Sequence, residues 1–235
     1  MYQFESRIRF SEVDDTGHLD MASLINYLQD CSLFHAEEVG LGLSYYIKHK
    51  KAWFLTSWQI EVIRFPELYE KIRIATYPHN FKSFMGDRSF VITDEQGDIC
   101  AKADSTWIYM NTELNKPVRA LPHEIEPFAP ISLPDADYNK KKRIRLVPGM
   151  DKLETIPVLP SYIDTNHHMN NGQYVKLAQN YLPLNFHPVR IQADYVNAAK
   201  KGDTLYPMTY ISDSSCIIAF TNVDEKPYAV MEFVS

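Results

Sequence analysis

The chain has 235 residues, 45% of them hydrophobic and 23% charged, with 8 glycines and a formal net charge of −6. This composition is typical of a folded globular protein, and the length suffices for one large domain or two of about 100–120 residues. The acidic balance argues against nucleic acid as a partner. Cys31, Cys100 and Cys216 are far apart and odd in number, so neither a disulfide framework nor a zinc site is expected.

The N-terminal residues carry no recognisable targeting signal. Residues 1–5 lack a basic region followed by an apolar run, and no apolar stretch approaches the roughly 20 residues that a membrane-spanning helix needs. We therefore expect a cytoplasmic protein without a membrane span.

The first half is predicted to place one long helix before an antiparallel meander. Residues 2–10 alternate sufficiently for a strand, and Asp20 is a candidate N-cap for a helix from Met21 to about Val39. The apolar stripe of this helix consists of Leu24, Leu28, Cys31, His35 and Val39. Strands are expected at 53–65, 71–77, 87–94 and 99–110, with a hairpin turn at 94–98.

The second half repeats this order after a different kind of segment. Residues 121–149 contain five prolines and the basic run 139–145, so they are predicted to be a linker. A short strand then follows at 158–163, a helix at about 171–182, and strands at 190–196, 204–211, 216–223 and 227–233. The predicted organisation is an N-terminal domain over residues 1–120, the linker over 121–149, and a C-terminal domain over 150–235.

The most informative segment is 161–174, in which Asp164, Asn166 and His168 occupy alternate positions. Imidazole has a pKa suited to accepting or donating a proton near neutral pH. The carboxylate can orient the imidazole, or can itself attack a carbonyl and form an anhydride. The carboxamide is an uncharged donor that can hold a thioester oxygen or a water. The pattern therefore predicts a site that polarises a carbonyl and activates a water.

The N-terminal region contains a second copy of this motif. Residues 11–20 align with 161–170 without a gap at an offset of 150, so that Asp14 falls on Asp164 and His18 on His168. Thr16 stands where the second copy has the amide. We interpret this as a duplicated fold with one working site, in the second half, and one retired site with a structural role.

Together these features resemble the acyl-acyl carrier protein thioesterases, which are double-hotdog enzymes of plant plastids and of bacteria. The resemblance covers nearly the whole chain and rests on D-x-N-x-H-x-N-N at 164–171 and on the segments 26–30, 53–55, 64–66, 88–90 and 105–107. It implies an α+β double hotdog, in which each antiparallel sheet wraps round a central helix. It also implies hydrolysis of fatty acyl-acyl carrier protein without a cofactor or metal, by Asp164, Asn166 and His168.

The sequence departs from the family pattern at one position. The family has an acidic residue, in many members followed by Cys, a few residues after a Tyr on the strand that follows the second helix. Here Tyr195 is followed by Val196, Asn197, Ala198 and Ala199, with neither Glu nor Cys. The resemblance therefore does not supply a glutamate base or a cysteine nucleophile at Asn197 or Ala198.

Two further roles are considered for the segment around His168: oxyanion binding by backbone N–H groups, and metal binding. The N–H groups at the helix start, near Asn171 and Gly172, can also face an oxyanion, but Asn and Asp before a helix commonly serve only as turn and cap residues. A metal site built from His167, His168 and Asp164 is the less favoured reading.

An acidic carrier protein needs a basic surface on this acidic chain. The preferred candidates are Lys140, Lys141, Lys142, Arg143 and Arg145, with Lys48, Lys50, Lys51, Lys200 and Lys201 as alternatives. Leu24, Leu28, Trp53 and Phe54 either line an acyl tunnel or form ordinary core.

Two other functions compete with acyl-carrier-protein hydrolysis. One is a different hotdog enzyme, either a coenzyme A thioesterase or a hydratase, and the other is a non-catalytic acyl-binding module. The paired amides after His168 favour the thioesterase. A monomer suffices for a double hotdog, although a homodimer is compatible with the sequence.

Overall fold

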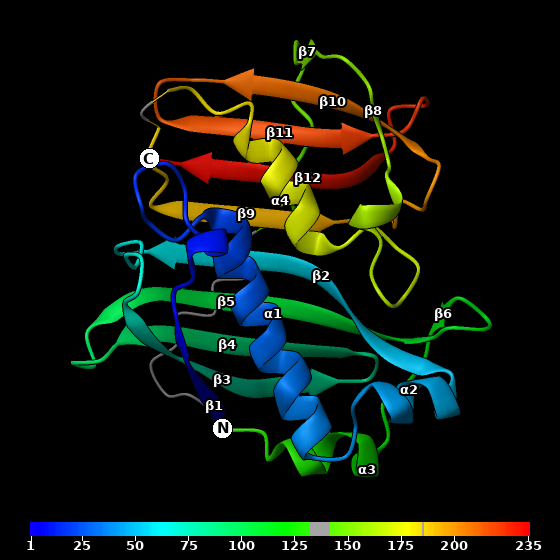
Figure 1. Cartoon of the computed structure of the whole chain (residues 1–235). Coiled ribbons are helices and arrows are strands. Elements are labelled where there is room, and N and C mark those ends of the chain that lie inside the picture. Colours follow the sequence, from blue (N-terminus) through cyan, green and yellow to red (C-terminus); the bar gives the residue numbers. More distant parts are fainter. Residues whose placement is uncertain (132–141, 185) are drawn as a thin grey trace. The chain divides into compact units, whose positions relative to one another are not determined.

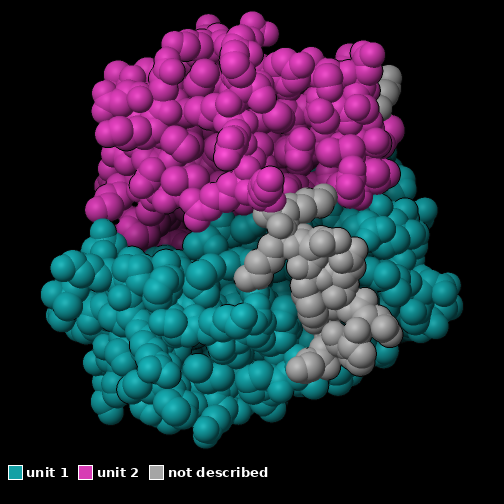
Figure 2. All heavy atoms as spheres, turned by 180° about the vertical axis from the view of Figure 1, so that it is seen from behind, with its two compact units in different colours: residues 1–140 teal, residues 141–235 magenta. Residues whose placement is uncertain are grey.

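The chain forms two structural units, residues 1–140 and 141–235, coloured teal and magenta in Figure 2. The structure is a computed structural model and describes residues 1–131, 142–184 and 186–235. The boundary between the units falls inside the predicted linker. Within the described ranges, no helix is long and apolar enough to cross a membrane.

Unit 1 packs a long helix against an antiparallel sheet (Figure 1). Its strands are β1 (Tyr2–Arg7), β2 (Lys51–Val62), β3 (Lys71–Lys82), β4 (Met85–Asp94), β5 (Ile99–Asn111) and the short β6 (Lys116–Pro117). The strand order is β1-β3-β4-β5-β2, and β6 pairs with β5. The helices are η1 (Phe10–Glu12), α1 (Met21–Glu38), α2 (Leu43–His49), α3 (Pro122–Ile125) and η2 (Glu126–Phe128).

Helix α1 begins and packs as its sequence predicts. The Asp20 carboxylate accepts the backbone N–H of Ser23 at 2.7 Å, which satisfies one of the unpaired donors of the first turn. The stripe residues Leu24, Leu28, Cys31 and His35 are all buried, and they face the sheet of unit 1. The stripe continues to Val39, which caps the C-terminus of the helix.

Three helical segments of unit 1 were not predicted, and the first is the short η1, which begins at the end of the expected strand 2–10. Helix α2 follows the glycines that end α1, and its seven residues are too few for a clear periodic pattern. Within the predicted linker, α3 and η2 form a short helical segment, and Phe128 at its end is buried against Ala36 and Leu41. This part of the linker therefore contributes to the core of unit 1.

Unit 2 repeats the arrangement in a smaller form. It contains β7 (Asp151–Lys152), β8 (Ile156–Pro157), η3 (Pro160–Tyr162), α4 (Asn171–Gln179), β9 (Arg190–Tyr195), β10 (Thr204–Ile211), β11 (Ser215–Thr221) and β12 (Pro227–Val234). The strand order is β9-β12-β11-β10-β7, with β8 also paired to β10. Read from the other end, it matches β1-β3-β4-β5-β2, so each unit is a hotdog fold and the chain is a double hotdog.

Two predicted boundaries of unit 2 were wrong. The expected strand at 158–163 is replaced by the 3₁₀ turn η3, which begins at Pro160, a residue without the N–H that a strand ladder needs. The expected helix to Leu182 ends earlier: α4 stops at Gln179 and is capped by Asn180. The remaining strands of unit 2 lie within two residues of their predicted positions. In unit 1, β1 ends at Arg7 instead of residue 10, β2 ends at Val62 instead of residue 65, and β3 continues to Lys82 instead of ending at residue 77.

Opposite faces of the unit 2 sheet are covered by different segments. Tyr174 of α4 packs against Phe220 and Tyr195, which both pair with Ala229 across the neighbouring strands and so point to the same face of the sheet. One residue along each strand, Ala219 pairs with Val230, and because strand side chains alternate, this pair points to the opposite face. On that second face, Ile144, Leu146 and Val147 pack against a cluster of Met150, Met208, Ile217, Ala219 and Val230.

Candidate active site

The segment before α4 is a tight loop organised by Asp164. The Asp164 carboxylate Oδ1 accepts the backbone N–H groups of Asn166 at 2.8 Å and of His168 at 3.3 Å. Its own N–H donates to the carbonyl of His168 at 2.8 Å, and its carbonyl accepts the N–H of His167 at 3.1 Å. His167 has φ of 61°, in the left-handed region. Asp164 therefore closes the loop that presents Asn166 and His168.

This loop is fixed to α4 and to the stretch after β9. The backbone N–H of Met169 donates to the carbonyl of Ala199 at 2.8 Å. The N–H of Ala199 in turn donates to the buried Tyr174 hydroxyl on α4 at 3.2 Å. Because Ala199 is hydrogen-bonded to both the loop and α4, it holds the loop against the helix.

The start of α4 has less donor capacity than the sequence predicted. Asn170 is the N-cap, and its side-chain Oδ1 accepts the N–H of Gly172 at 2.8 Å. Gly172 is also buried. This corrects the expectation that Gly172 offers an unpaired N–H to an oxyanion: the cap already uses it. At Asn171, the backbone carbonyl accepts the Tyr195 hydroxyl at 3.1 Å.

His168 is half-buried, whereas Asn166 and His167 are exposed. Burial lowers the pKa of His168 below its ordinary value, the Asp164 charge opposes this, and the charges of Lys200 and His167 add to the lowering. His168 is therefore predominantly neutral at pH 7 and able to accept a proton. The Asn166 carboxamide makes no hydrogen bond to the described residues of the chain.

The loop before α1 in unit 1 has nearly the same backbone. Asp14 N–H donates to the His18 carbonyl at 2.8 Å, and Asp14 Oδ1 accepts the N–H groups of Thr16 at 2.9 Å and His18 at 3.1 Å. Gly17, at the position of His167, is also left-handed, with φ of 84°. The offset of 150 therefore relates two loops of the same conformation.

The side chains of the two loops differ at one decisive position. In unit 1, the Thr16 hydroxyl lies 2.7 Å from Asp14 Oδ1 and 2.9 Å from His18 Nδ1, so it ties the carboxylate to the imidazole. Hydrogen bonds from Thr16 and from the His18 N–H outweigh the effect of burial and hold the pKa of Asp14 below its usual range. The side chains of Asp14, Thr16 and His18 are therefore joined to one another by hydrogen bonds.

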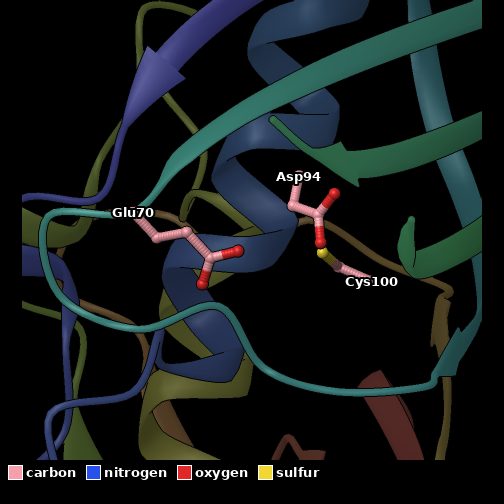
Figure 3. A group of neighbouring side chains, drawn as sticks. All are labelled: Glu70, Asp94 and Cys100. Carbon is pink, nitrogen blue, oxygen red and sulfur yellow. The ribbon is translucent and has the colours of Figure 1, made fainter. Parts of the chain in front are cut away.

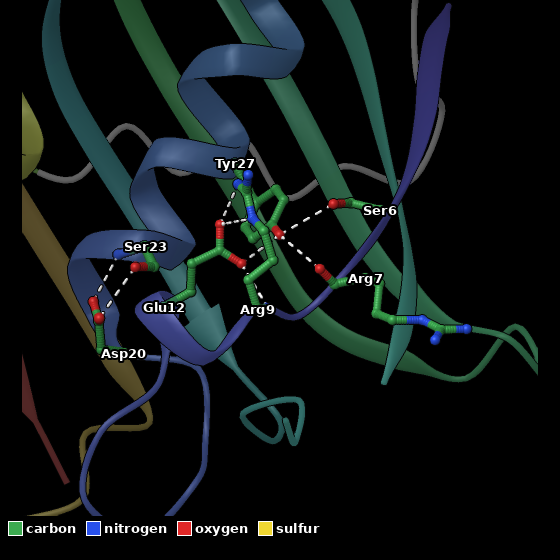
Figure 4. Close-up of polar contacts among 7 residues, drawn as sticks. All are labelled: Ser6, Arg7, Arg9, Glu12, Asp20, Ser23 and Tyr27. Atoms are coloured by element: carbon green, nitrogen blue, oxygen red, sulfur yellow. Dashed lines mark hydrogen bonds and ion pairs between the residues drawn. The ribbon is translucent and has the colours of Figure 1, made fainter. Parts of the chain in front are cut away.

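A polar network anchors the unit 1 loop (Figure 4). The Tyr27 hydroxyl donates to Glu12 Oε2 at 2.8 Å, and Arg9 Nε donates to Glu12 Oε1 at 2.8 Å. The Glu12 carbonyl accepts the N–H of the α1 cap residue Asp20 at 2.9 Å. In unit 2 the equivalent of Glu12 is Tyr162, so this ionic network belongs to unit 1.

The positions to which the resemblance assigns an acidic residue, Asn197 and Ala198, adjoin the candidate site. Asn197 is exposed, and its Nδ2 donates to the Pro227 carbonyl at 2.8 Å. Ala199, two residues later, accepts the Met169 N–H. The structure therefore places Asn197 and Ala198 beside the loop, but they supply neither a carboxylate nor a thiol.

A cluster that could hold a metal lies elsewhere, in unit 1. Among the described residues, Glu70, Asp94 and Cys100 form the group whose ligand atoms all lie within 4.8 Å of one another (Figure 3); Asp164, His167 and His168 do not form such a group. Arg64 already bridges Glu70 at 2.6 Å and Asp94 at 2.7 Å. Burial raises the pKa of Cys100 to about 11, so the thiol keeps its proton. We assign this cluster to an ion-pair network.

The residues predicted to dock the carrier protein or to line an acyl tunnel differ in burial and in pairing. Lys142, Arg143 and Arg145 are exposed, whereas Lys140 and Lys141 lie outside the described residues. Of the alternative cations, Lys51 is paired with Glu124 at 3.0 Å, and Lys48, Lys50, Lys200 and Lys201 are exposed. Of the predicted tunnel residues, Trp53 lines a pocket in unit 1, Phe54 is partly buried, and Leu24 and Leu28 are buried core. Arg88, which also lines that pocket, was not singled out as a site residue, because a single Arg within a strand carries no motif.

Comparisons with known proteins agree with this architecture. The model of the acyl-ACP thioesterase N-terminal domain matches residues 1–128, and that of the C-terminal domain matches residues 149–226. A chloroplastic palmitoyl-acyl carrier protein thioesterase of Gossypium hirsutum is 25% identical over 225 residues, which cover 88% of this chain and 54% of the relative. The acyl-[acyl-carrier-protein] hydrolase FATB3 of Cuphea viscosissima is 28% identical over 175 residues, covering 69% of this chain and 42% of the relative. The chain thus spans about half the length of the curated relatives it matches.

Solved structures show the same fold over the full chain. An acyl-ACP thioesterase from Bacteroides thetaiotaomicron superposes with a TM-score of 0.89 at 23% identity, covering 99% of this chain and 96% of the other. The 12:0-ACP thioesterase from Umbellularia californica gives a TM-score of 0.88 at 20% identity, with the same two coverages. Since the two domain models together match most of the sequence, the chain belongs to the acyl-ACP thioesterase family.

Proposed function

We propose that this chain hydrolyses the thioester that joins a fatty acyl group to acyl carrier protein, releasing free fatty acid and so ending or diverting fatty acid synthesis. The observation that carries the proposal is the loop of unit 2. A carboxylate, an exposed carboxamide and a half-buried imidazole lie on one hydrogen-bonded turn, in a chain that belongs to this family.

In the proposed reaction His168 acts as the base. A water attacks the carbonyl carbon and gives its proton to the neutral imidazole, and the carbonyl oxygen becomes an oxyanion. The Asp164 charge favours the imidazolium that forms. The tetrahedral intermediate then collapses, the carbon–sulfur bond breaks, and the imidazolium protonates the departing thiolate. The products are the fatty acid and the carrier protein thiol.

We assign oxyanion stabilisation to Asn166. Its carboxamide is exposed and has no hydrogen bond to the described residues, whereas the N–H of Gly172 is occupied by the Asn170 cap. A single oxyanion donor is typically worth about 10²–10³ in rate. Direct attack by Asp164 is disfavoured because its Oδ1 already accepts two backbone N–H groups.

We further propose that the basic segment docks the acidic carrier protein. Its described part, Lys142, Arg143 and Arg145, is anchored to unit 2, because the Ile144 N–H donates to Asp194 Oδ2 at 2.7 Å. Gln192 Nε2 donates to the Lys142 carbonyl at 3.1 Å. Because the backbone is held while the Arg side chains are exposed, docking there costs less conformational entropy than docking to a free linker.

Thiol release from acyl carrier protein substrates of varied chain length, with the matching coenzyme A esters alongside, tests this function. We expect turnover of carrier-protein substrates, and a raised KM for them alone when Arg143 and Arg145 are both changed to Glu. Turnover of coenzyme A esters only would assign the chain to a coenzyme A thioesterase. Tight acyl binding without turnover on either would make it an acyl-binding module and contradict the proposal.

A further inference from the structure

The loop of unit 2 supplies one side-chain amide as an oxyanion donor. Asn166 offers an exposed carboxamide, whereas the N–H of Gly172 is occupied by the Asn170 cap. The Asp164 charge favours the imidazolium of His168 but repels a negative oxygen. Oxyanion sites in acyl transfer commonly combine two donors. A second donor beside His168 would therefore complete the site.

The turn that follows β9 lies directly against this loop. The Met169 N–H donates to the Ala199 carbonyl at 2.8 Å, and Lys200 comes next in the chain. The Lys200 N–H donates to Asp203 Oδ2 at 2.9 Å, and the Asp203 N–H donates to the Lys200 carbonyl at 3.0 Å. The backbone of Lys200 is therefore held by hydrogen bonds beside the loop.

Unit 1 repeats this turn after β2. The Leu19 N–H donates to the Pro66 carbonyl at 2.8 Å. The Glu67 N–H donates to Glu70 Oε2 at 2.9 Å, and the Glu70 N–H donates to the Glu67 carbonyl at 3.1 Å. Each of these bonds has its counterpart in the turn after β9, so Glu67 corresponds to Lys200.

The turn of unit 1 shows which residue faces the histidine of the loop. His18 and Glu67 form an antiparallel bridge, so they lie directly opposite each other. Residues that are opposite in such a pair point their side chains to the same side. By the correspondence of the two units, Lys200 lies opposite His168. An exposed anion beside the histidine of unit 1 is thus replaced by an exposed cation beside the histidine of unit 2.

The Lys200 side chain is exposed and free to bind an anion. Among the residues that the structure describes, no carboxylate forms an ion pair with Lys200. Its charge acts on the histidine: burial lowers the pKa of His168, the Asp164 charge opposes this, and the Lys200 charge adds to the lowering. The neighbouring Asn197 and Ala198 carry no charge. The three donors of the ammonium group are therefore available at the loop.

We propose that Lys200 is a further catalytic residue, whose ammonium group donates a hydrogen bond to the oxyanion of the tetrahedral intermediate, together with the Asn166 carboxamide. This role rests on the proposed hydrolysis. As the water oxygen bonds to the carbonyl carbon, the second electron pair of the C=O bond moves to the oxygen, and the water proton goes to His168. Lys200 keeps its own proton throughout and stabilises the charge that develops on that oxygen.

Steady-state kinetics of Lys200→Met at about pH 8.5 test this role. This pH is roughly two units above the ordinary histidine pKa, so His168 is neutral in the variant as well and a change in its pKa does not enter. We expect kcat to fall about tenfold, which is less than for a preorganised donor because water and salt screen an exposed ammonium. A loss of less than about threefold overturns the proposal.

Two further substitutions at the same position separate charge from shape. Lys200→Arg keeps the cation and should retain kcat within about threefold of the wild type. Lys200→Glu copies unit 1 and should lose more than Lys200→Met, because a carboxylate repels the oxyanion. Equal kcat values in Lys200→Arg, Lys200→Met and Lys200→Glu would show that charge at this position is irrelevant and would overturn the proposal.

A small substrate separates this role from docking of the carrier protein. Octanoyl-N-acetylcysteamine is a thioester without a carrier protein and without a phosphate, so Lys200→Met should lose the same factor on it as on the carrier-protein substrate. Lys176→Met removes another exposed charge of unit 2, on α4, and should leave kcat on both substrates unchanged. A loss confined to the KM of the carrier-protein substrate, or an equal loss of kcat in Lys176→Met, would make Lys200 a surface charge only and overturn the proposal.

The pKa of His168, followed by NMR of its imidazole protons, tests the placement of Lys200 without turnover. Lys200→Met should raise this pKa, whereas Lys176→Met should leave it unchanged. No upward shift in Lys200→Met overturns the placement. An upward shift in a chain without thioesterase turnover would contradict the proposed function alone. Wild-type turnover with an unaffected kcat in Lys200→Met would contradict this inference alone.

Discussion

The loops at 14–18 and 164–168 have the same backbone and different chemistry. Both are closed by an aspartate that accepts two backbone N–H groups, and both place a histidine four residues later. In unit 1 a threonine hydroxyl joins the carboxylate to the imidazole. In unit 2 an exposed carboxamide occupies that position, while the histidine is half-buried in both loops.

This difference teaches that the aspartate has a structural role in both copies. A duplicated turn keeps its Asp whether or not it catalyses, because the backbone needs the acceptor. The aspartate alone therefore does not distinguish the two copies, and the difference must lie in what the second loop adds: the carboxamide of Asn166, and a His168 whose neutral form is favoured by burial. Four experiments, in order of decreasing expected effect, sharpen or break this comparison.

Of these four experiments, Asp164→Asn is expected to have the largest effect. This variant keeps an oxygen that can accept the two N–H groups of the loop but removes the charge that stabilises the imidazolium, so turnover should fall by about 10²–10³. Thermal unfolding should stay near that of the wild type. The matched change in unit 1, Asp14→Asn, should leave turnover unaffected. If Asp164→Asn retains full turnover, Asp164 is a turn residue only.

Asn166→Thr copies the unit 1 loop into unit 2. The hydroxyl is expected to bridge Asp164 and His168 as Thr16 bridges Asp14 and His18, and the loss of the oxyanion donor should reduce kcat by about 10² with little change in KM. The reverse change, Thr16→Asn, should not alter steady-state kinetics. A raised KM at unchanged kcat would show that Asn166 only binds substrate.

Tyr174→Phe tests how the loop is held against α4. Removing the hydroxyl leaves the buried Ala199 N–H without its acceptor, which should lower the free energy of unfolding by about 1–3 kcal/mol in urea titrations. Tyr210→Phe, at an exposed position, should change it by less than about 0.5 kcal/mol. Equal values for the two variants would mean that the Ala199 bond adds nothing.

The smallest effect concerns pH. Because His168 acts as its neutral form, kcat/KM should rise with pH through the His168 pKa, with a midpoint below the ordinary value of about 6.5. The Lys200 charge lowers this pKa, so Lys200→Met should move the midpoint upward, and Asp164→Asn should move it downward. A midpoint above 6.5 in the wild type, or a downward shift in Lys200→Met, contradicts the assignment of His168.

The sequence predicted those parts of the fold that local patterns determine. The stripe from Leu24 to His35 is buried as expected, and every predicted strand except that at 158–163 begins within two residues of its expected start, because burial of one face imposes the period. The offset of 150 also predicted two equivalent loops, since a shared spacing of Asp and His demands a shared backbone.

The rest depends on contacts between distant segments. Nothing near Arg143 indicates that Ile144 and Leu146 pack against a cluster formed by the unit 2 sheet and Met150, because the sheet residues of that cluster are distant in the sequence. Likewise, the N–H of Gly172 is occupied because of the rotamer of Asn170, which the sequence does not specify. The sequence of β4 also does not show that Arg88 is buried, because burial depends on the segments that pack around the strand. Such features appear only once the fold brings the groups together.

The most direct test of the central claim compares His168→Ala with His18→Ala under the same conditions, with the carrier-protein substrate that the wild type turns over fastest. We predict that turnover falls by about 10²–10⁴ in His168→Ala and stays within about twofold of the wild type in His18→Ala. Equal losses in both variants, or a larger loss in His18→Ala, would contradict the assignment of the working site to unit 2.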